Sequence, residues 1–265
     1  MFPVLIRLGP VTIHSYGLMM AVGVAFGLWF LYRQAKAQGL DAARISDAGF
    51  YTILISLFGA KLILFLGNLS YYTRYPGELL SLARSGGVFQ GGLVFGLVFA
   101  LWYFRRRRIP TWKVADIAGA AVALGHGFGR IGCFLAGCCY GRPCSTALGV
   151  TFTSQYSHDL TGIPLHEPIH PVQLYESGLN FLNFFVLFLI LRRKKFDGQV
   201  FSLYIINYSL IRYFTEFFRG DHPERAFLVK GTSPYLSLSW PQLFCILGLI
   251  LGLILFSLLK NKKSA

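Results

Sequence analysis

The chain has 265 residues, of which 54% are hydrophobic, and its mean hydropathy is +0.54. This composition excludes an ordinary water-soluble domain and predicts an integral membrane protein. The formal net charge of +14 could indicate nucleic-acid binding. The basic residues, however, form clusters at alternate ends of apolar segments, so no nucleic-acid partner is expected.

Seven apolar segments, each close to the length that crosses a bilayer core, follow one another along the chain. They predict an all-α membrane protein with seven transmembrane helices at residues 16–32, 48–69, 86–104, 114–135, 173–191, 200–218 and 241–259. The first segment begins too late and is too rich in glycine for a cleaved signal peptide, so we expect it to be retained.

Basic clusters follow the first, third, fifth and seventh segments. Their members are Arg33, Lys36 and Arg44; Arg105–Arg108 and Lys113; Arg192–Lys195; and Lys260, Lys262 and Lys263. Positive residues mark cytoplasmic loops, which predicts an N-terminus outside and a C-terminus inside. The whole chain, 1–265, is then one polytopic membrane domain, and the long loop 136–170 is expected to fold as a small extracytoplasmic cap.

Arg130 lies near the outer end of the fourth segment. A guanidinium at that depth costs at least a few kcal/mol, so it indicates a functional site with an anionic partner. Phosphate suits it, because the planar guanidinium can bind two phosphate oxygens at once. Lys61, Gln90 and His126 also interrupt apolar segments. Lys61 fits a ligand role and a snorkelling role equally, and His126 is more typical of a hydrogen-bonded packing residue.

Arg212, Glu216 and Arg219 are spaced by four and three residues in the sixth segment, which places them on one helical face. Glu216 can pair with one arginine and leave the other for a ligand. The alternative is an ion network that only locks helices together. Glycines beside Gln90 and through the fourth segment could admit a lipid headgroup, although close helix packing alone explains them equally well.

Several linked motifs together resemble those of a known family, in the same order. They are Ile13-His14-Ser15-Tyr16-Gly17-Leu18-Met19, Gly59-Ala60-Lys61-Leu62, Gln90-Gly91-Gly92-Leu93-Val94-Phe95-Gly96, Gly129-Arg130-Ile131-Gly132-Cys133-Phe134 through Gly141, His170-Pro171-Val172-Gln173-Leu174-Tyr175-Glu176, and Arg212 to Arg219. Through them the chain resembles the phosphatidylglycerol–prolipoprotein diacylglyceryl transferases, multi-pass enzymes of the bacterial inner membrane.

The resemblance implies a transferase of lipoprotein biosynthesis that uses no cofactor and no metal. The thiol of a lipobox cysteine in a prolipoprotein would displace glycerol 1-phosphate from phosphatidylglycerol and receive the diacylglyceryl group. By resemblance, the catalytic positions are Tyr16, Gln90, Arg130 and Arg212, and the substrate-binding positions are Arg130, Gly141, His170, Arg212 and Glu216.

Three departures from the family pattern fall on positions that the family is thought to need. Gln90 stands at a histidine position, Cys133 at an asparagine and Cys138 at a glutamate. Either the enzyme takes the thiol proton through another group, such as His14, Tyr16 or His126, or the chain is a paralogue that binds lipid without turnover.

Four of the five cysteines lie within twelve residues: Cys133, Cys138, Cys139 and Cys144. In an oxidising compartment, disulfides are the default, and we expect Cys138 and Cys139 to pair with Cys133 and Cys144 rather than with each other. A metal site, built from all four cysteines or with His126 or His170 added, is a less favoured alternative. A thiol–disulfide oxidoreductase would use the cluster directly, but the chain has no C-x-x-C pair. Cys245 is expected in the packed core.

Overall fold

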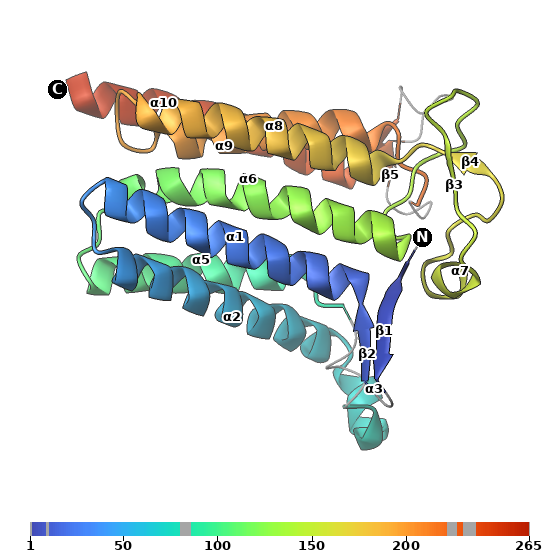
Figure 1. The fold of residues 1–265 in the computed structure, drawn as a ribbon. Helices are drawn as coiled ribbons and strands as arrows, with labels where there is room; N and C mark the ends of the chain where they lie inside the picture. The colour runs from blue at the N-terminus through green and yellow to red at the C-terminus, as the bar shows by residue number, and fades with distance from the viewer. Residues whose placement is uncertain (1, 9–10, 80–85, 222–226, 230–236, 265) are drawn as a thin grey trace. The chain divides into compact units, whose positions relative to one another are not determined.

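The computed structural model describes residues 2–8, 11–79, 86–221, 227–229 and 237–264. In this part of the chain the fold is mainly helical (Figure 1), and seven long helices coincide one by one with the seven apolar segments. They are α1 Ser15–Ala37, α2 Ala42–Gly67, α5 Phe89–Arg106, α6 Thr111–Ala136, α8 Val172–Arg192, α9 Gln199–Glu216 and α10 Trp240–Ser264. The all-α expectation is therefore confirmed.

Shorter elements connect these helices. The helical ones are α3 Leu69–Arg74, η1 Pro76–Glu78 and α7 Gln155–Thr161. The strands form three antiparallel pairs: β1 Val4–Leu8 with β2 Val11–His14, β3 Val150–Thr151 with β4 Pro168–Ile169, and β5 Phe227–Val229 with β6 Leu238–Ser239.

Five of the long helices, α1, α2, α6, α8 and α10, are long and apolar enough to cross a membrane. The chain is thus a helical, multi-pass membrane protein. The other two, α5 and α9, have 18 residues each, and their crossing of the bilayer stays a prediction. On α10, Leu247, Leu251, Ile254 and Leu258 are exposed at spacings of four and three residues, which gives the helix an apolar outer face suited to lipid.

The chain divides into two compact units, residues 30–114 and residues 1–29 with 115–265. In the first, α2 and α5 pack through glycines. A Cβ built on Gly92 would lie 3.0 Å from the carbonyl oxygen of Ser56, and one on Gly91 would lie within 2.9 Å of the Ile63 side chain. The glycines beside Gln90 therefore serve close helix packing, which was the alternative interpretation of these residues.

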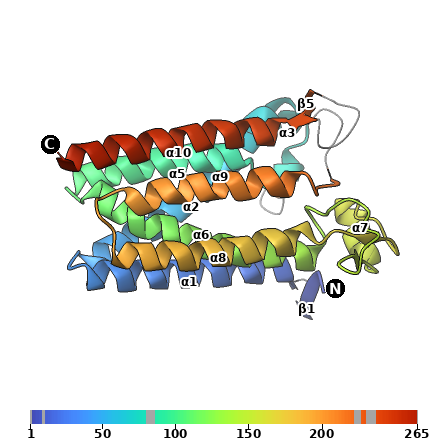
Figure 2. The same cartoon turned by 90° about the horizontal axis from the view of Figure 1, so that it is seen from above.

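The second unit is built around α6. Gly125 of α6 faces Gly23 of α1, and a Cβ on Gly127 would meet the Phe181 ring of α8 at 2.7 Å. Figure 2 shows α9 between α8 and α10. The side-chain amide of Asn207 on α9 donates to that of Asn183 on α8 at 2.8 Å, a cross-helix hydrogen bond of the kind that joins helices in lipid.

Asp116 of α6 binds the first residues of α9, at the end of this unit where α8 ends. Its carboxylate is fully buried and accepts hydrogen bonds from the backbone N–H groups of Gly198 and Phe201, at 2.9 and 3.0 Å. It also pairs with Lys194 at 2.8 Å. The carboxylate thereby satisfies donors that a helix N-terminus leaves unpaired.

The segment 136–170 folds beyond the C-terminus of α6 and leads into α8 (Figure 1). Phe152, Ile163 and Ile169 form its buried core, against which Phe134 and Tyr140 pack. Helix α7 ends at Gly162 with a left-handed φ of +71°, a conformation that glycine adopts without steric cost. This segment is called the cap below, and its location outside the cytoplasm stays a prediction.

Candidate functional site

Three helices of the α6-containing unit bring two arginines onto one carboxylate. Arg130 of α6 pairs through Nε with Oε2 of Glu176 on α8, while Nη1 of Arg212 on α9 lies 3.4 Å from Oε1 of the same Glu176. Thr215 donates to that Oε1 at 2.8 Å. Glu176 is therefore the centre of the cluster, a role that the sequence alone did not predict.

Glu216 extends this cluster from α9. It pairs with Nη1 of Arg212, and its Oε1 accepts a hydrogen bond from the Ser239 hydroxyl at 2.8 Å. The backbone N–H of Ser239 in turn donates to Oε1 of Gln242 at 2.9 Å, so the beginning of α10 is tied to the same network. The expected pairing of Glu216 with one arginine is thus confirmed, and that arginine is Arg212.

Both carboxylates are almost fully buried, with side-chain exposures of 2% for Glu176 and 3% for Glu216. The two arginine side chains keep 12% and 14% of their surface. A guanidinium has five N–H donors, and the ion pairs above use one nitrogen of each. The cluster can therefore bind a further oxyanion while it stays paired with the two carboxylates.

The third member of the predicted triad, Arg219, lies just beyond the end of α9. Its Nε and Nη2 bind Asp221 at 2.9 and 2.6 Å, so the expectation of an arginine left free by Glu216 is wrong at this position. Arg142 donates from Nε to the carbonyl oxygen of Arg219 at 2.9 Å. Burial alone would lower the pKa of Arg219, but Asp221 and nearby Cys139 outweigh burial and raise it.

Gly141 lies where three segments of the chain meet, those that contain Gly141, His170 and Arg219. It forms an antiparallel bridge with Arg219, and a Cβ at this position would lie 2.8 Å from Cβ of His170. The ring of His170 packs 5.3 Å from that of Phe218, and its Nδ1 lies 3.3 Å from the Tyr175 hydroxyl. These contacts give Gly141 and His170 a structural role, and their part in substrate binding stays a prediction.

Tyr16 is the second residue of α1 and lies against the last turns of α6. A Cβ on Gly132 would lie 3.3 Å from Cδ2 of Tyr16, and 42% of the Tyr16 residue surface is exposed. His126, one turn before Arg130, lies 5.1 Å from the ring of Tyr208, in agreement with a packing role. Gln90 and Lys61 belong to the other unit, where Gln90 is exposed in the first turn of α5, so their place in a site stays a prediction.

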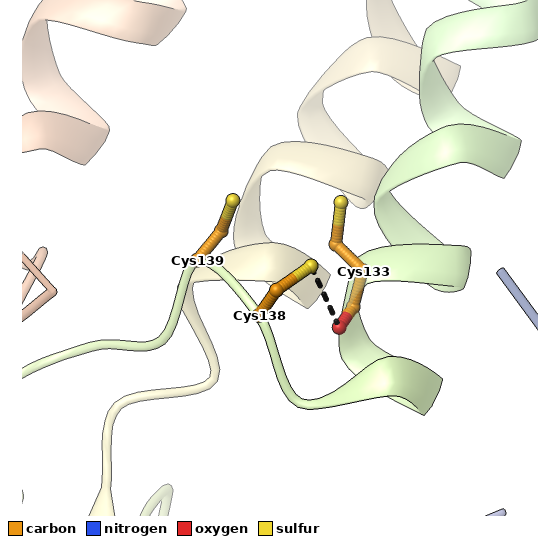
Figure 3. Close-up of side chains that lie close together, drawn as sticks. All are labelled: Cys133, Cys138 and Cys139. Atoms are coloured by element: carbon orange, nitrogen blue, oxygen red, sulfur yellow. Dashed lines mark hydrogen bonds between the residues drawn. The ribbon is translucent and has the colours of Figure 1, made fainter. Parts of the chain in front are cut away.

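Three thiols gather at the end of α6, as Figure 3 shows. The sulfurs of Cys133, Cys138 and Cys139 all lie within 4.8 Å of one another, and Cys138 contacts the carbonyl oxygen of Cys133 at 3.7 Å. All five cysteines are free thiols, so the expected disulfides are not present. Cys144 lies apart with Thr146, at 3.1 Å, because the chain leaves the turn before reaching it. Cys245 is buried in α10, as expected.

The turn that brings these thiols together has an unusual backbone. Gly137 has a φ of +81° and Cys139 a φ of +60°, a left-handed conformation that costs a side-chain-bearing residue about 1–2 kcal/mol. Gln173 holds the turn by donating to the carbonyl oxygen of Cys138 at 2.9 Å. Hydrogen bonds from Cys133 and Cys138, and then the charge of Arg219, lower the pKa of the Cys139 thiol far below its ordinary value.

Sequence reasoning identified Arg130, Arg212 and Glu216 and missed Glu176. The sequence does contain a signal for Glu176, because an ionisable residue inside the apolar segment 173–191 indicates a functional position. Thr215 and Ser239 gave no such signal, since isolated hydroxyl residues are common in membrane helices.

Comparison with known proteins identifies the same family by two routes. Residues 3–258 match the family described as prolipoprotein diacylglyceryl transferase. Several proteins named phosphatidylglycerol–prolipoprotein diacylglyceryl transferase are similar along nearly their whole length. The one from Clostridium tetani is 33% identical over 99% of this chain and 100% of its own. The one from Bordetella avium is 34% identical over 99% and 96%, and the one from Rhodospirillum rubrum 32% over 98% and 93%.

Proposed function

Because this chain belongs to the prolipoprotein diacylglyceryl transferase family, we propose that Arg130 and Arg212 form the site that binds the phosphate of its lipid substrate. The protein is an enzyme of lipoprotein biosynthesis, and it transfers the diacylglyceryl group of phosphatidylglycerol to a prolipoprotein. The acceptor is the thiol of a lipobox cysteine, and the second product is glycerol 1-phosphate.

One observation supports this proposal above the others: two guanidinium groups from different helices share the carboxylate of Glu176. Glu176 fixes both arginines in place and keeps their charges from repelling the helices apart. Each guanidinium still has N–H donors beyond its ion pair, and these can bind the oxygens of one phosphate between them.

The transfer reaction requires a site that binds the phosphate of the lipid. The thiolate sulfur attacks the glycerol carbon that bears the phosphate, a carbon–sulfur bond forms, and the carbon–oxygen bond breaks with its electron pair on the phosphate oxygen. Negative charge therefore grows on the leaving phosphate in the transition state. Fixed positive groups that face this charge lower the barrier, because they need no reorganisation at the moment of reaction.

We place the site toward the extracytoplasmic side of the bacterial inner membrane. The support is the distribution of basic clusters after alternate segments, which favours a cap outside and a C-terminus inside. Arg130 lies six residues before the end of α6, and the cap begins directly after that end. A lipid headgroup at the membrane surface would lie at this depth.

The competing explanation is that the network of Arg130, Glu176, Arg212 and Glu216 only locks the helices together. Arginine-to-lysine substitutions separate the two roles. Lysine keeps the charge and can still pair with a buried carboxylate, but it cannot bind two oxygens in the planar arrangement of a guanidinium. A purely structural network should therefore tolerate lysine far better than a phosphate site.

The test is a transfer assay with purified protein, phosphatidylglycerol vesicles and a lipobox peptide. Arg130→Lys and Arg212→Lys should each lower kcat/KM by about 100-fold or more, as loss of one transition-state donor does elsewhere. Arg44→Lys, at an exposed ion pair of α2, is the matched control and should change little. Folded Arg130→Lys protein with near-normal transfer would exclude a phosphate role for that residue.

A further inference from the structure

We propose that Cys133, Cys138 and Cys139 bind one zinc ion, whose fourth coordination position takes up and activates the thiol of the prolipoprotein. This inference rests on the proposed function, because the thiol is that of the enzyme's acceptor substrate. It assigns to the three-thiol cluster a chemical role that the arginine network does not supply.

The geometry fits a thiolate site. Zinc–sulfur bonds of about 2.3 Å in a tetrahedron place neighbouring sulfurs about 3.8 Å apart. The three sulfurs already lie within 4.8 Å of one another, so small side-chain rotations suffice (Figure 3). Zinc prefers cysteine sulfur among protein ligands, and three cysteines meet that preference.

The ligand count indicates a reactive site rather than a closed structural one. Among the described residues, no fourth cysteine, histidine or carboxylate joins the cluster. Structural zinc sites have four protein ligands, whereas catalytic sites have three and leave one position open. The three cysteines are also only partly buried, so a substrate thiol can approach the open position.

The backbone is shaped to bring the three sulfurs together. The left-handed Cys139 and Gly137 turn the chain back toward α6, and the N–H groups of Gly137 and Cys138 both donate to the carbonyl oxygen of Cys133, at 3.0 and 3.1 Å. A left-handed non-glycine residue persists only where its surroundings enforce it, and such residues concentrate at functional sites.

The cluster lies beside the proposed phosphate site. Cys133 follows Arg130 by three residues on α6, which places both on one helical face. Arg130 interacts electrostatically with Cys133 and Cys139, and Tyr16 with all three cysteines. Zinc with three thiolates has a net charge of −1, and the guanidinium groups of Arg130 and Arg219, although each is paired with a carboxylate, are near enough to Cys139 to stabilise that charge.

The step that zinc would promote balances without an oxidant or reductant. The substrate thiol binds zinc and releases its proton to water, because a thiol that coordinates zinc is deprotonated. The zinc-bound sulfur then forms its bond to the lipid carbon as the phosphate leaves. The resulting thioether is neutral and a weaker ligand than a thiolate, so the product dissociates. The carboxylates of Glu176 and Glu216 are both paired with arginines, and zinc would make a separate base unnecessary.

The first test is the metal content of full-length protein purified in detergent from zinc-containing medium. Mass spectrometry of the metal should find about one zinc per chain, the stoichiometry of a single site. Cys133→Ser, Cys138→Ser and Cys139→Ser should each lower zinc content at least several-fold. Cys144→Ser is the matched control, because this buried thiol lies in the cap but outside the cluster, and it should keep its zinc.

The second test uses the wild-type protein with cobalt in place of zinc, so it does not depend on the folding of any variant. Sulfur-to-cobalt charge-transfer bands should appear, and a lipobox peptide should shift the visible cobalt bands as its thiol binds. A peptide with serine at the lipobox position should not shift them. Absence of metal, a disulfide within the cluster, or no response to the cysteine peptide would each overturn the inference.

Transfer activity distinguishes failure of this inference from failure of the proposed function. Metal-free protein that transfers lipid at the full rate would overturn the zinc site and leave the transferase function intact. Protein that binds zinc and responds to the cysteine peptide but never forms the thioether would overturn the function itself.

Discussion

Glu176 is the residue on which both arginines of the proposed phosphate site depend. Its side chain is 2% exposed and contacts Arg130, Arg212 and Thr215. Removing one partner of a buried ion pair leaves the other charge uncompensated, which is among the most costly changes a protein core can undergo.

We therefore expect Glu176→Gln to lower the free energy of unfolding by about 3–5 kcal/mol and to reduce transfer, because Arg130 loses its ion-pair partner and Arg212 keeps only Glu216. Thermal unfolding in detergent and the lipid transfer assay measure the two effects. Glu167→Gln, at an exposed cap residue, is the control and should leave both unchanged. Normal activity in folded Glu176→Gln would show that the arginines are positioned by other contacts.

Gln90 gives a second prediction at this scale. If its amide only hydrogen-bonds the substrate while another group removes the thiol proton, Gln90→Ala should raise the barrier by about 1–3 kcal/mol. Gln90→His should retain activity. Both are read from kcat/KM in the same assay, and complete loss in Gln90→His would mean that the pocket is built around the amide.

Residue-level prediction from sequence worked where a charge had no place in lipid and failed where contacts came from distant segments. Arg130 and Arg212 stand out because an isolated charge in an apolar segment needs a partner. The identity of that partner, Glu176, depends on which faces of α6, α8 and α9 meet, and a single sequence does not contain that information. The disulfide prediction rests on the oxidising compartment, and nothing in the cysteine spacing reveals the left-handed turn at Cys139 or the cluster of free thiols that it shapes.

At the scale of the helices, the seven apolar segments located each of the seven long helices that the structure describes, with most ends within two residues and a few displaced by three to six. Helix α1 continues to Ala37 and α2 begins at Ala42, outside the predicted 16–32 and 48–69. Hydropathy detects only the part of a helix that suits lipid, whereas backbone hydrogen bonding continues beyond it.

The attachment of α9 to α6 is a specific contact between elements, since Asp116 binds Lys194 and two backbone N–H groups. We expect Asp116→Asn to destabilise the protein by about 3–5 kcal/mol, because Lys194 loses its buried partner. Asp197→Asn is the matched control: Asp197 pairs with the same lysine but is 43% exposed, so its loss should cost under 1 kcal/mol. Equal effects on thermal unfolding would contradict this account.

For the whole molecule, the distribution of basic residues predicts its orientation. Green fluorescent protein fused after Ala265 should fluoresce, because it folds in the cytoplasm, and alkaline phosphatase fused within the cap should be active, because it requires export. The opposite pattern would reverse the orientation and move the proposed site to the cytoplasmic side.

The buried carboxylate of Asp116 also has a consequence during synthesis of the protein. Its partners Lys194, Gly198 and Phe201 follow it in the chain by 78 to 85 residues. At about 5–20 residues per second, a ribosome needs about 4–17 s to produce them. Throughout that interval the carboxylate of Asp116, in the second turn of α6, lacks the partners of the folded protein and must be solvated by water at the membrane surface. We therefore expect this end of α6 to reach its final packing only after the beginning of α9 has been synthesised.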